Sequence, residues 1–393
     1  MVGRVWRQLA AGGAILLLTV ALASGCTPAA GQQPAAESPA GGPPAAPPAA
    51  DRSQAPAQAP ASPFADAAMP FPSWVAGLRD EALSAGISSA TFDRALASVA
   101  PLPRVIELDR RQPEGTISFA TYVSRVVSPA RIAAGRRHMV ENAALLQQIQ
   151  QRYHVQPRFI VALWAVESSF GQSAGDTPTI PALATLAYDG RRSRFFRGEL
   201  LAALRILERG AIAPERMRGS WAGAMGQCQF MPSSYLKYAV AFEGSGQPDI
   251  WSSRADVLAS IANYLATVGW SDHGTWGREV TLPADFDAAL VDLKVKKPLG
   301  SWAKLGVRRA DGGALPVAAL NASLVRPDGG GGRAFLIYDD YRALMDWNRS
   351  TYFATSIGLL ADAIGDSDAQ VAQAGKRGKS PQGAARSRRM IER

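Results

Sequence analysis

Cysteine and histidine are scarce in this sequence, which has two cysteines and three histidines among 393 residues. Two cysteines cannot build the disulfide framework of a small secreted domain. The histidines, His138, His154 and His273, are scattered along the chain, so we expect no zinc site. No histidine lies in the segment around Cys228, so we expect this cysteine to be a small buried residue rather than an activated nucleophile.

A long hydrophobic run is also missing near the N-terminus. The apolar run at residues 14–22 follows two arginines and is too short to span a bilayer comfortably. Small residues then lead to Cys26, which is typical of a bacterial lipoprotein cleavage site. We therefore predict a signal peptide at residues 1–25 and lipidation of Cys26, with an ordinary signal peptide or an uncleaved anchor as the alternative. Thr27, rather than aspartate, follows the cysteine, which favours the outer membrane over the inner one.

Two further segments have compositions that do not suit a folded core. Residues 26–69 are dense in Pro, Ala, Gly and Gln, and they are predicted to form a disordered tether. Residues 366–393 hold seven Lys and Arg against three acidic residues, and they are predicted to form a basic disordered tail that contributes to the net charge of +9. Nucleic acid is not an expected partner, because the chain has an export signal and no base-reading motif.

Residues 157–171 place a carboxylate at the end of an apolar stretch. Pro157 suits a first helical turn and Gly171 suits the exit, so we expect a buried helix of roughly three turns. Burial raises the pKa of a carboxyl, and an acid that stays protonated near neutral pH can protonate a glycosidic oxygen. Glu167 is therefore a candidate general acid, and the alternative is a glutamate that only hydrogen-bonds to nearby backbone.

Residues 223–235 combine glycines, glutamine and proline in a pattern that suits sugar binding. The glycines allow close backbone approach, and Gln229 offers an amide donor and an acceptor beside apolar residues. Pro232 favours the start of another helix, with Ser233 and Ser234 as candidate caps. A tight structural loop is the alternative.

Together, the two segments resemble the membrane-bound lytic murein transglycosylases of the B type. Glu-Ser-Ser-Phe-Gly at residues 167–171 and Gly-Ala-Met-Gly-x-x-Gln-Phe-Met-Pro-Ser-Ser-Tyr at residues 223–235 carry the resemblance. It continues through residues 182–189, 262–265 and 347–350, and it covers about residues 70–362.

This resemblance implies a lysozyme-like catalytic core with an additional helical subdomain, within a catalytic domain at residues 70–365. The helical spacing of most segments likewise predicts a mainly α fold with a small β part, with strand-like segments at residues 294–307 and 332–338.

The resemblance also implies the reaction. Members of this family cleave the β-1,4 bond between N-acetylmuramic acid and N-acetylglucosamine and leave 1,6-anhydro-muramic acid ends, without water and without a cofactor. Glu167 then serves as the single general acid and base. The family's substrate-binding positions correspond to Ser220, Gln229, Tyr264, Asn348 and Tyr122. Each of these residues has core packing or capping as its alternative role.

Two positions depart from the family pattern. Phe353 stands where the family usually has tyrosine, so we expect one hydroxyl contact to the glycan to be missing. Some members also carry a calcium loop, but Ala241 and Ser245 occupy its carboxylate positions here, and Glu243 and Asp256 alone are a poor ligand set. We therefore predict no specific metal site.

The expected partners are peptidoglycan glycan strands and the membrane, reached through the lipid on Cys26, with cell-wall synthesis enzymes as further candidates. The expected location is the periplasmic side of the outer membrane, and a soluble periplasmic protein is the alternative. Two other functions stay open: a hydrolytic muramidase, and a peptidoglycan-binding lipoprotein without turnover. Anhydro ends, reducing ends or no cleavage would separate the three functions.

Overall fold

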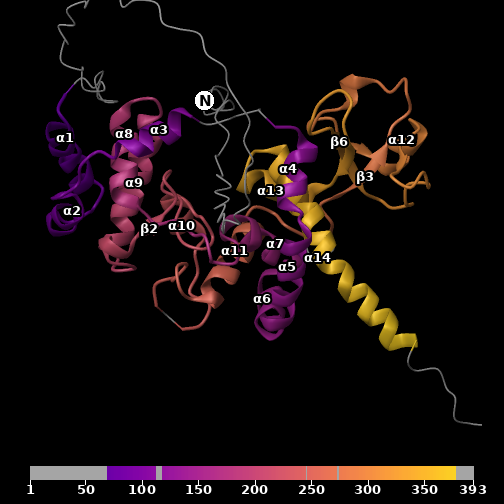
Figure 1. Cartoon of the computed structure of the whole chain (residues 1–393), viewed down its shortest axis with the longest axis horizontal. Coiled ribbons are helices and arrows are strands. Elements are labelled where there is room, and N and C mark those ends of the chain that lie inside the picture. Colours follow the sequence, from indigo (N-terminus) through magenta and orange to yellow (C-terminus); the bar gives the residue numbers. More distant parts are fainter. Residues whose placement is uncertain (1–68, 112–116, 245, 272–273, 378–393) are drawn as a thin grey trace, which may run out of the picture. The chain divides into compact units, whose positions relative to one another are not determined.

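A computed structural model describes residues 69–111, 117–244, 246–271 and 274–377, so Cys26 and the predicted signal peptide lie outside the described residues (Figure 1). The helices are α1 (Phe71–Ser84), α2 (Ser89–Leu96), α3 (Pro103–Arg110), α4 (Phe119–Val126), α5 (Pro129–Glu141), α6 (Ala143–Tyr153), α7 (Pro157–Ser168), α8 (Thr179–Asp189), α9 (Ser193–Glu208), α10 (Pro232–Tyr238), α11 (Arg254–Thr267), α12 (Leu299–Lys304), α13 (Asp339–Trp347) and α14 (Thr351–Arg377). The strands are β1 (Thr177–Pro178), β2 (Arg218–Gly219), β3 (Gly277–Thr281), β4 (Lys297–Pro298), β5 (Arg308–Arg309), β6 (Asn321–Val325) and β7 (Ala334–Ile337).

Serine residues begin several of these helices. A serine side chain accepts a hydrogen bond from the backbone N–H three residues later and so satisfies a donor that the helix itself leaves unpaired. The serines that do this, at the starts of α2, α4, α5 and α11, are Ser88, Ser118, Ser128 and Ser253.

The helix α7 is buried at the centre of its neighbours. Every residue from Phe159 to Ser168 is buried, and α5, α6, α11 and α14 pack against the helix (Figure 1). Pro157 occupies its first turn, as predicted, where the missing N–H breaks no helical hydrogen bond. The last turn carries Glu167, so the packing of α7 determines where this carboxyl lies.

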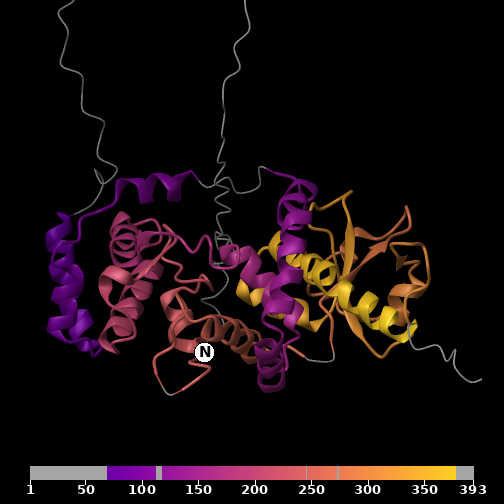
Figure 2. The ribbon, with the colours of Figure 1, turned by 60° about the horizontal axis from the view of Figure 1, so that its bottom comes forward.

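The small β part is a five-stranded antiparallel sheet in the order β4-β6-β7-β3-β5. Figure 2 shows this orange β part beside the yellow C-terminal helices. The sheet and α12 share an apolar core that consists of Val280, Leu299, Trp302, Val307, Leu315, Ala322, Leu324, Ala334, Leu336 and Tyr338. The prediction of a strand at residues 332–338 is confirmed by β7. The prediction for residues 294–307 was mostly wrong, because β4 is the one strand there and Leu299 and Trp302, which follow it, belong to α12.

The last helix, α14, packs against α4, α5 and α7. Its close approach requires glycine: a Cβ on Gly358 would lie 2.2 Å from Cδ2 of Trp276, and a Cβ on Gly135 of α5 would lie 2.5 Å from Cδ1 of Ile364. The helix continues to Arg377, beyond residue 365, where we placed the end of the catalytic domain. None of the described helices combines the length and the apolar character needed to cross a membrane.

Candidate active site

Glu167 has a buried carboxyl group that accepts a hydrogen bond from a tryptophan side chain. It lies in the last turn of α7 with 6% of its surface exposed. Nε1 of Trp347 donates a hydrogen bond of 2.6 Å to Oε1, whereas Oε2 is buried and has no hydrogen-bond partner among the described residues. Burial raises the pKa of Glu167 to about 8, although the indole N–H opposes this shift by stabilising the carboxylate. The carboxyl group is therefore protonated at neutral pH.

The chain bends sharply after Glu167. Ser169, Phe170 and Gly171 have φ values of 49°, 61° and 86°, a left-handed conformation that non-glycine residues rarely adopt. The Phe170 ring packs against Trp164, with 5.3 Å between centroids, and the backbone N–H of Phe170 donates to the carbonyl of Trp164. Packing thus holds an unfavourable backbone conformation beside the candidate acid.

Gln227 joins the predicted sugar-binding segment to the helix of Glu167. Its Oε1 accepts a hydrogen bond of 2.9 Å from Nε1 of Trp164, and its Nε2 donates one of 2.9 Å to the carbonyl of Trp251. A Cβ on Gly171 would lie 2.4 Å from Gln227 Oε1, which explains glycine at that position. Our sequence reasoning missed Gln227, although it lies within the segment 223–235 and carries the same amide group as Gln229.

Gln229 lies in a tight turn between Met225 and Phe230, whose backbones exchange hydrogen bonds of 2.8 and 3.1 Å. The φ of Gln229 is 51°, and its Nε2 donates to the carbonyls of Ala174 and Gly226. Among the described residues none donates to its Oε1, so this oxygen is the group that Gln229 can offer to a ligand.

Ser220 closes the turn that precedes this segment. Its Oγ accepts a hydrogen bond of 3.1 Å from the N–H of Ala224, and its own N–H donates to the carbonyl of Ala224. At the other end of the segment, the predicted caps are wrong, because Met231 is the N-cap of α10. Ser233 instead donates from both N and Oγ to the buried carboxylate of Glu199.

Tyr264 and Trp347 belong to one aromatic cluster with Phe230. The Trp347 ring lies 4.6 Å from the ring of Tyr264 and 5.3 Å from that of Phe230. The Tyr264 hydroxyl donates a hydrogen bond of 2.8 Å to the carbonyl of Asp346, so the ring rather than the hydroxyl is available to a ligand. Asn348 follows Trp347 and is 3% exposed, and its Oδ1 accepts from the N–H of Ser350.

The structure therefore links Glu167 to this cluster through Trp347, which we did not select from the sequence. The sequence could have indicated Trp347, because this residue stands directly before Asn348 in the segment 347–350 that carries the family resemblance.

Tyr122 on α4 lies within electrostatic reach of Glu167. Burial raises the pKa of this phenol to about 12, and the charge of Glu167 adds to the shift. Phe353 does not meet the expectation of a groove residue, because it is 1% exposed and packed in the core. The hydroxyl of its neighbour Tyr352 donates a hydrogen bond of 2.6 Å to Asp328. A tyrosine at position 353 would bury its hydroxyl in this core, so the phenylalanine does not cost the enzyme the hydroxyl contact to the glycan that we expected to be missing.

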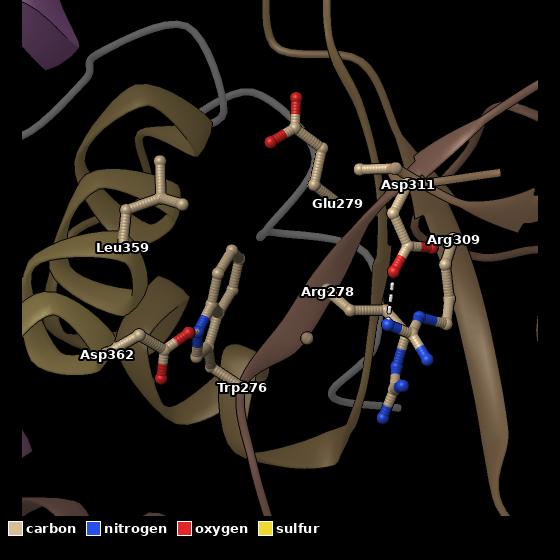
Figure 3. A pocket seen from close by; sticks show the side chains of 9 residues that line it. Trp276, Arg278, Glu279, Arg309, Asp311, Leu359 and Asp362 are labelled. Carbon is tan, nitrogen blue, oxygen red and sulfur yellow. Dashed lines mark hydrogen bonds and ion pairs between the residues drawn. The ribbon is translucent and has the colours of Figure 1, made fainter. Parts of the chain in front are cut away.

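A separate pocket of about 370 Å³ lies beside the sheet and α14 (Figure 3). Its charged groups have partners: Asp362 accepts from Nε1 of Trp276, Arg309 pairs with Asp311, and Arg278 donates to the hydroxyl of Tyr338. Asp362 also lies 3.9 Å from Arg158. Because Arg158 is at the opposite end of α7 from Glu167, this pocket is distinct from the candidate active site.

A mainly helical fold in which a central helix ends in a buried glutamic acid is typical of enzymes that cleave glycosidic bonds by acid catalysis. The comparisons with known proteins identify the family. The model of the transglycosylase SLT domain family matches residues 70–362. The chain is 32% identical over 254 residues to membrane-bound lytic murein transglycosylase B of Escherichia coli K12, covering 63% of this chain and 67% of that protein.

Solved structures agree with this match. SltB3 of Pseudomonas aeruginosa, in complex with NAG-NAM-pentapeptide, is 45% identical with a TM-score of 0.72, covering 75% of this chain and 79% of that one. The lytic transglycosylase Slt35 of Escherichia coli, in complex with calcium, is 28% identical with a TM-score of 0.65, covering 78% and 96%. This chain belongs to the transglycosylase SLT family and is a lytic murein transglycosylase. The predicted lysozyme-like, mainly α fold with a small β part is confirmed.

The calcium bound by Slt35 raises the question of whether this chain has a corresponding site. Asp256 is the buried carboxylate of this region, and its two oxygens accept hydrogen bonds from the backbone N–H groups of Phe242 and Asp249, at 2.9 and 2.8 Å. These N–H groups already neutralise part of the carboxylate charge, and Ala241 offers no side-chain oxygen where the family's calcium loop has a carboxylate, so too few charged ligands remain for Ca²⁺. The residues therefore do not fit a calcium ion, and no group of three or more His, Cys, Asp or Glu elsewhere in the described residues could hold a metal.

Proposed function

We propose that this transglycosylase cleaves the β-1,4 bond between N-acetylmuramic acid and N-acetylglucosamine in peptidoglycan, with Glu167 as its single general acid and base. The observation that carries the proposal is a buried carboxyl whose pKa is raised to about 8. In the described part of the chain, burial raises this pKa, the Trp347 N–H opposes the rise, and no second acid contributes to it. That isolation favours a mechanism with one carboxyl over the pair that ordinary glycosidases use.

The reaction has two proton transfers. The protonated carboxyl of Glu167 first gives its proton to the glycosidic oxygen as the bond to the anomeric carbon breaks. The resulting carboxylate then takes the proton of the muramic acid O6 hydroxyl, while O6 forms its bond to the anomeric carbon. The acid is regenerated, no water is consumed, and the product ends in a 1,6-anhydro ring. Attack by water in the second step would give the muramidase alternative.

We propose that the substrate contacts come from Ser220, Gln229, Tyr264, Asn348 and Tyr122. Gln229 offers Oε1 to a hydroxyl or an N-acetyl N–H, since its amide nitrogen already binds two carbonyls. Tyr264 offers its ring face, because its hydroxyl binds the backbone of Asp346.

We further propose that lipid on Cys26 anchors the enzyme to the periplasmic side of the outer membrane, with residues 27–69 as a tether that lets it reach the glycan strands. The description of the Escherichia coli relative as membrane-bound supports anchoring.

Cell-wall synthesis enzymes are candidate partners. A soluble periplasmic form is the alternative, and labelling with a radioactive fatty acid in Cys26→Ala and wild-type cells distinguishes the two.

Product analysis after digestion of purified peptidoglycan tests the reaction. Wild-type protein should release anhydro-muropeptides, and Glu167→Gln should lower the rate by at least roughly 10²–10⁴-fold, because one group serves both proton transfers. Glu199→Gln is the matched control, since Glu199 has the same exposed fraction of 6% but binds Ser233. Reducing ends would support the muramidase, and unaltered activity of Glu167→Gln would contradict the assignment of Glu167.

A further inference from the structure

The two oxygens of the Glu167 carboxyl are chemically different in this fold. Nε1 of Trp347 donates to Oε1 at 2.6 Å, whereas Oε2 is buried without a partner among the described residues. An indole N–H can only donate, and a protonated carboxyl carries its hydrogen on one oxygen. The oxygen without hydrogen is the better acceptor, so the indole N–H favours the acid form with its proton on Oε2.

We propose that Trp347 is a positioning residue that keeps the proton of Glu167 on Oε2 and so makes Oε2 the oxygen that serves the glycosidic bond. This inference rests on the function proposed above for Glu167. When the O–H bond at Oε2 breaks and the leaving oxygen takes the proton, negative charge spreads to Oε1, where the indole N–H stabilises it. Oε2 then takes the proton of the O6 hydroxyl, and the initial state returns.

The indole is held by contacts that do not use its N–H. Trp347 is the last residue of α13, and its ring packs against Tyr264 and Phe230. The Tyr264 hydroxyl binds the carbonyl of Asp346, directly before Trp347, and so fixes the backbone that carries the indole. A donor fixed in this way needs no reorganisation when the charge develops on Glu167.

The other titratable groups around Glu167 do not duplicate this role. Tyr122 on α4 and Cys228 beside α11 both have a pKa raised by burial and, to a smaller extent, by the charge of Glu167, so both are neutral near neutral pH. Arg131 of α5 acts on Tyr122. In the described residues, neither Tyr122 nor Cys228 donates a hydrogen bond to the carboxyl, and Cys228 Sγ donates to the carbonyl of Val257.

Titratable side chains on the other elements packed against α7 contact different parts of that helix. His138 of α5 and Arg254 of α11 lie against the ring of Trp164, one turn before Glu167. Asp362 of α14 lies near Arg158 in the first turn. Trp347 is therefore the described group that stabilises the ionised form of Glu167 by a direct hydrogen bond.

The variant Trp347→Phe keeps an aromatic ring and removes the N–H. A hydrogen bond to a charged group favours ionisation, so its loss should move the alkaline limb of kcat/KM upward by roughly one pH unit. We expect kcat to fall about tenfold at slightly acidic pH, with KM changed less than about twofold. Trp276→Phe is the matched control, because it also loses an indole bond to a carboxylate, that of Asp362, at 2.8 Å. Its pH profile should follow the wild type.

An unchanged alkaline limb in Trp347→Phe, or a rise in KM alone, would overturn the proposal and would leave Glu167 as the acid, provided that anhydro product still forms. Wild-type protein without anhydro product would instead overturn the proposed function.

A second measurement does not depend on the folding of the Trp347 variant. In protein labelled with ¹⁵N-tryptophan, one indole N–H resonance should titrate near pH 8 in the wild type and stay constant in Glu167→Gln. If no indole resonance distinguishes the two proteins, the hydrogen bond between Trp347 and Glu167 does not exist in solution and the proposal is wrong.

Discussion

The burial of Glu167 should make the stability of the protein depend on pH in a way that a single substitution removes. The pKa of this carboxyl is about 8 in the folded chain, against 4.5 for an ordinary glutamate. Between these two values the folded chain keeps a proton that the unfolded chain releases. The free energy of unfolding therefore decreases as the pH rises from 4.5 to about 8, and the stability that is present below the lower value is progressively lost.

The magnitude follows from the same two values. Each pH unit within this window changes the free energy of unfolding by about 1.4 kcal/mol, so between the ordinary pKa and neutral pH the loss amounts to about 3 kcal/mol. Glu167→Gln has no proton to release and can keep Oε1 as the acceptor of the Trp347 N–H. The variant should thus be more stable than the wild type at neutral pH, and its advantage should increase with pH.

Urea denaturation of both proteins, at several pH values from about 5 to about 7, measures this difference directly. Other titrating groups cancel in the comparison, because they are the same in both chains. Glu215→Gln, which changes an exposed carboxyl, should follow the wild type at every pH. A difference between Glu167→Gln and the wild type that stays constant with pH would refute the argument that burial keeps Glu167 protonated.

Two further predictions concern metal binding and helix packing. A chelator should leave the melting temperature unchanged and added calcium should not raise it, because Asp256 already accepts two backbone N–H groups and Ala241 supplies no carboxylate. A calcium-dependent rise of several degrees in thermal unfolding would reveal a site. Gly358→Ala should lower the free energy of unfolding by about 1–3 kcal/mol, since its Cβ would lie 2.2 Å from Trp276. The matched variant Gly198→Ala, on a helical surface with open space, should raise it by up to about 1 kcal/mol, and equal effects in urea denaturation would contradict the packing argument.

Predictions from local sequence patterns were wrong where two local structures suit the same residues and tertiary packing determines which of them forms. The apolar residues at 294–307 suited a strand, but Trp302 packs into the core of the sheet from α12 and donates its N–H to the carbonyl of Ala322. Phe353 stands where the family usually has tyrosine, and we expected this change to remove a hydroxyl contact to the glycan. The register of α14 instead turns Phe353 into the core and leaves Tyr352, about 100° away, bound to Asp328.

The sequence by itself determined that α7 is a buried helix with a carboxyl in its last turn. The reason is local: Pro157 fixes the start, and the apolar residues that follow leave no face suited to water. It also determined the family, through segments long enough to be specific. Only the tertiary structure decided which atoms surround Glu167. The bond from Trp347 joins residues 180 positions apart, and that from Trp164 to Gln227 joins residues 63 positions apart. Local periodicity places a residue on a face of its helix, whereas contacts between distant segments depend on how all the elements pack.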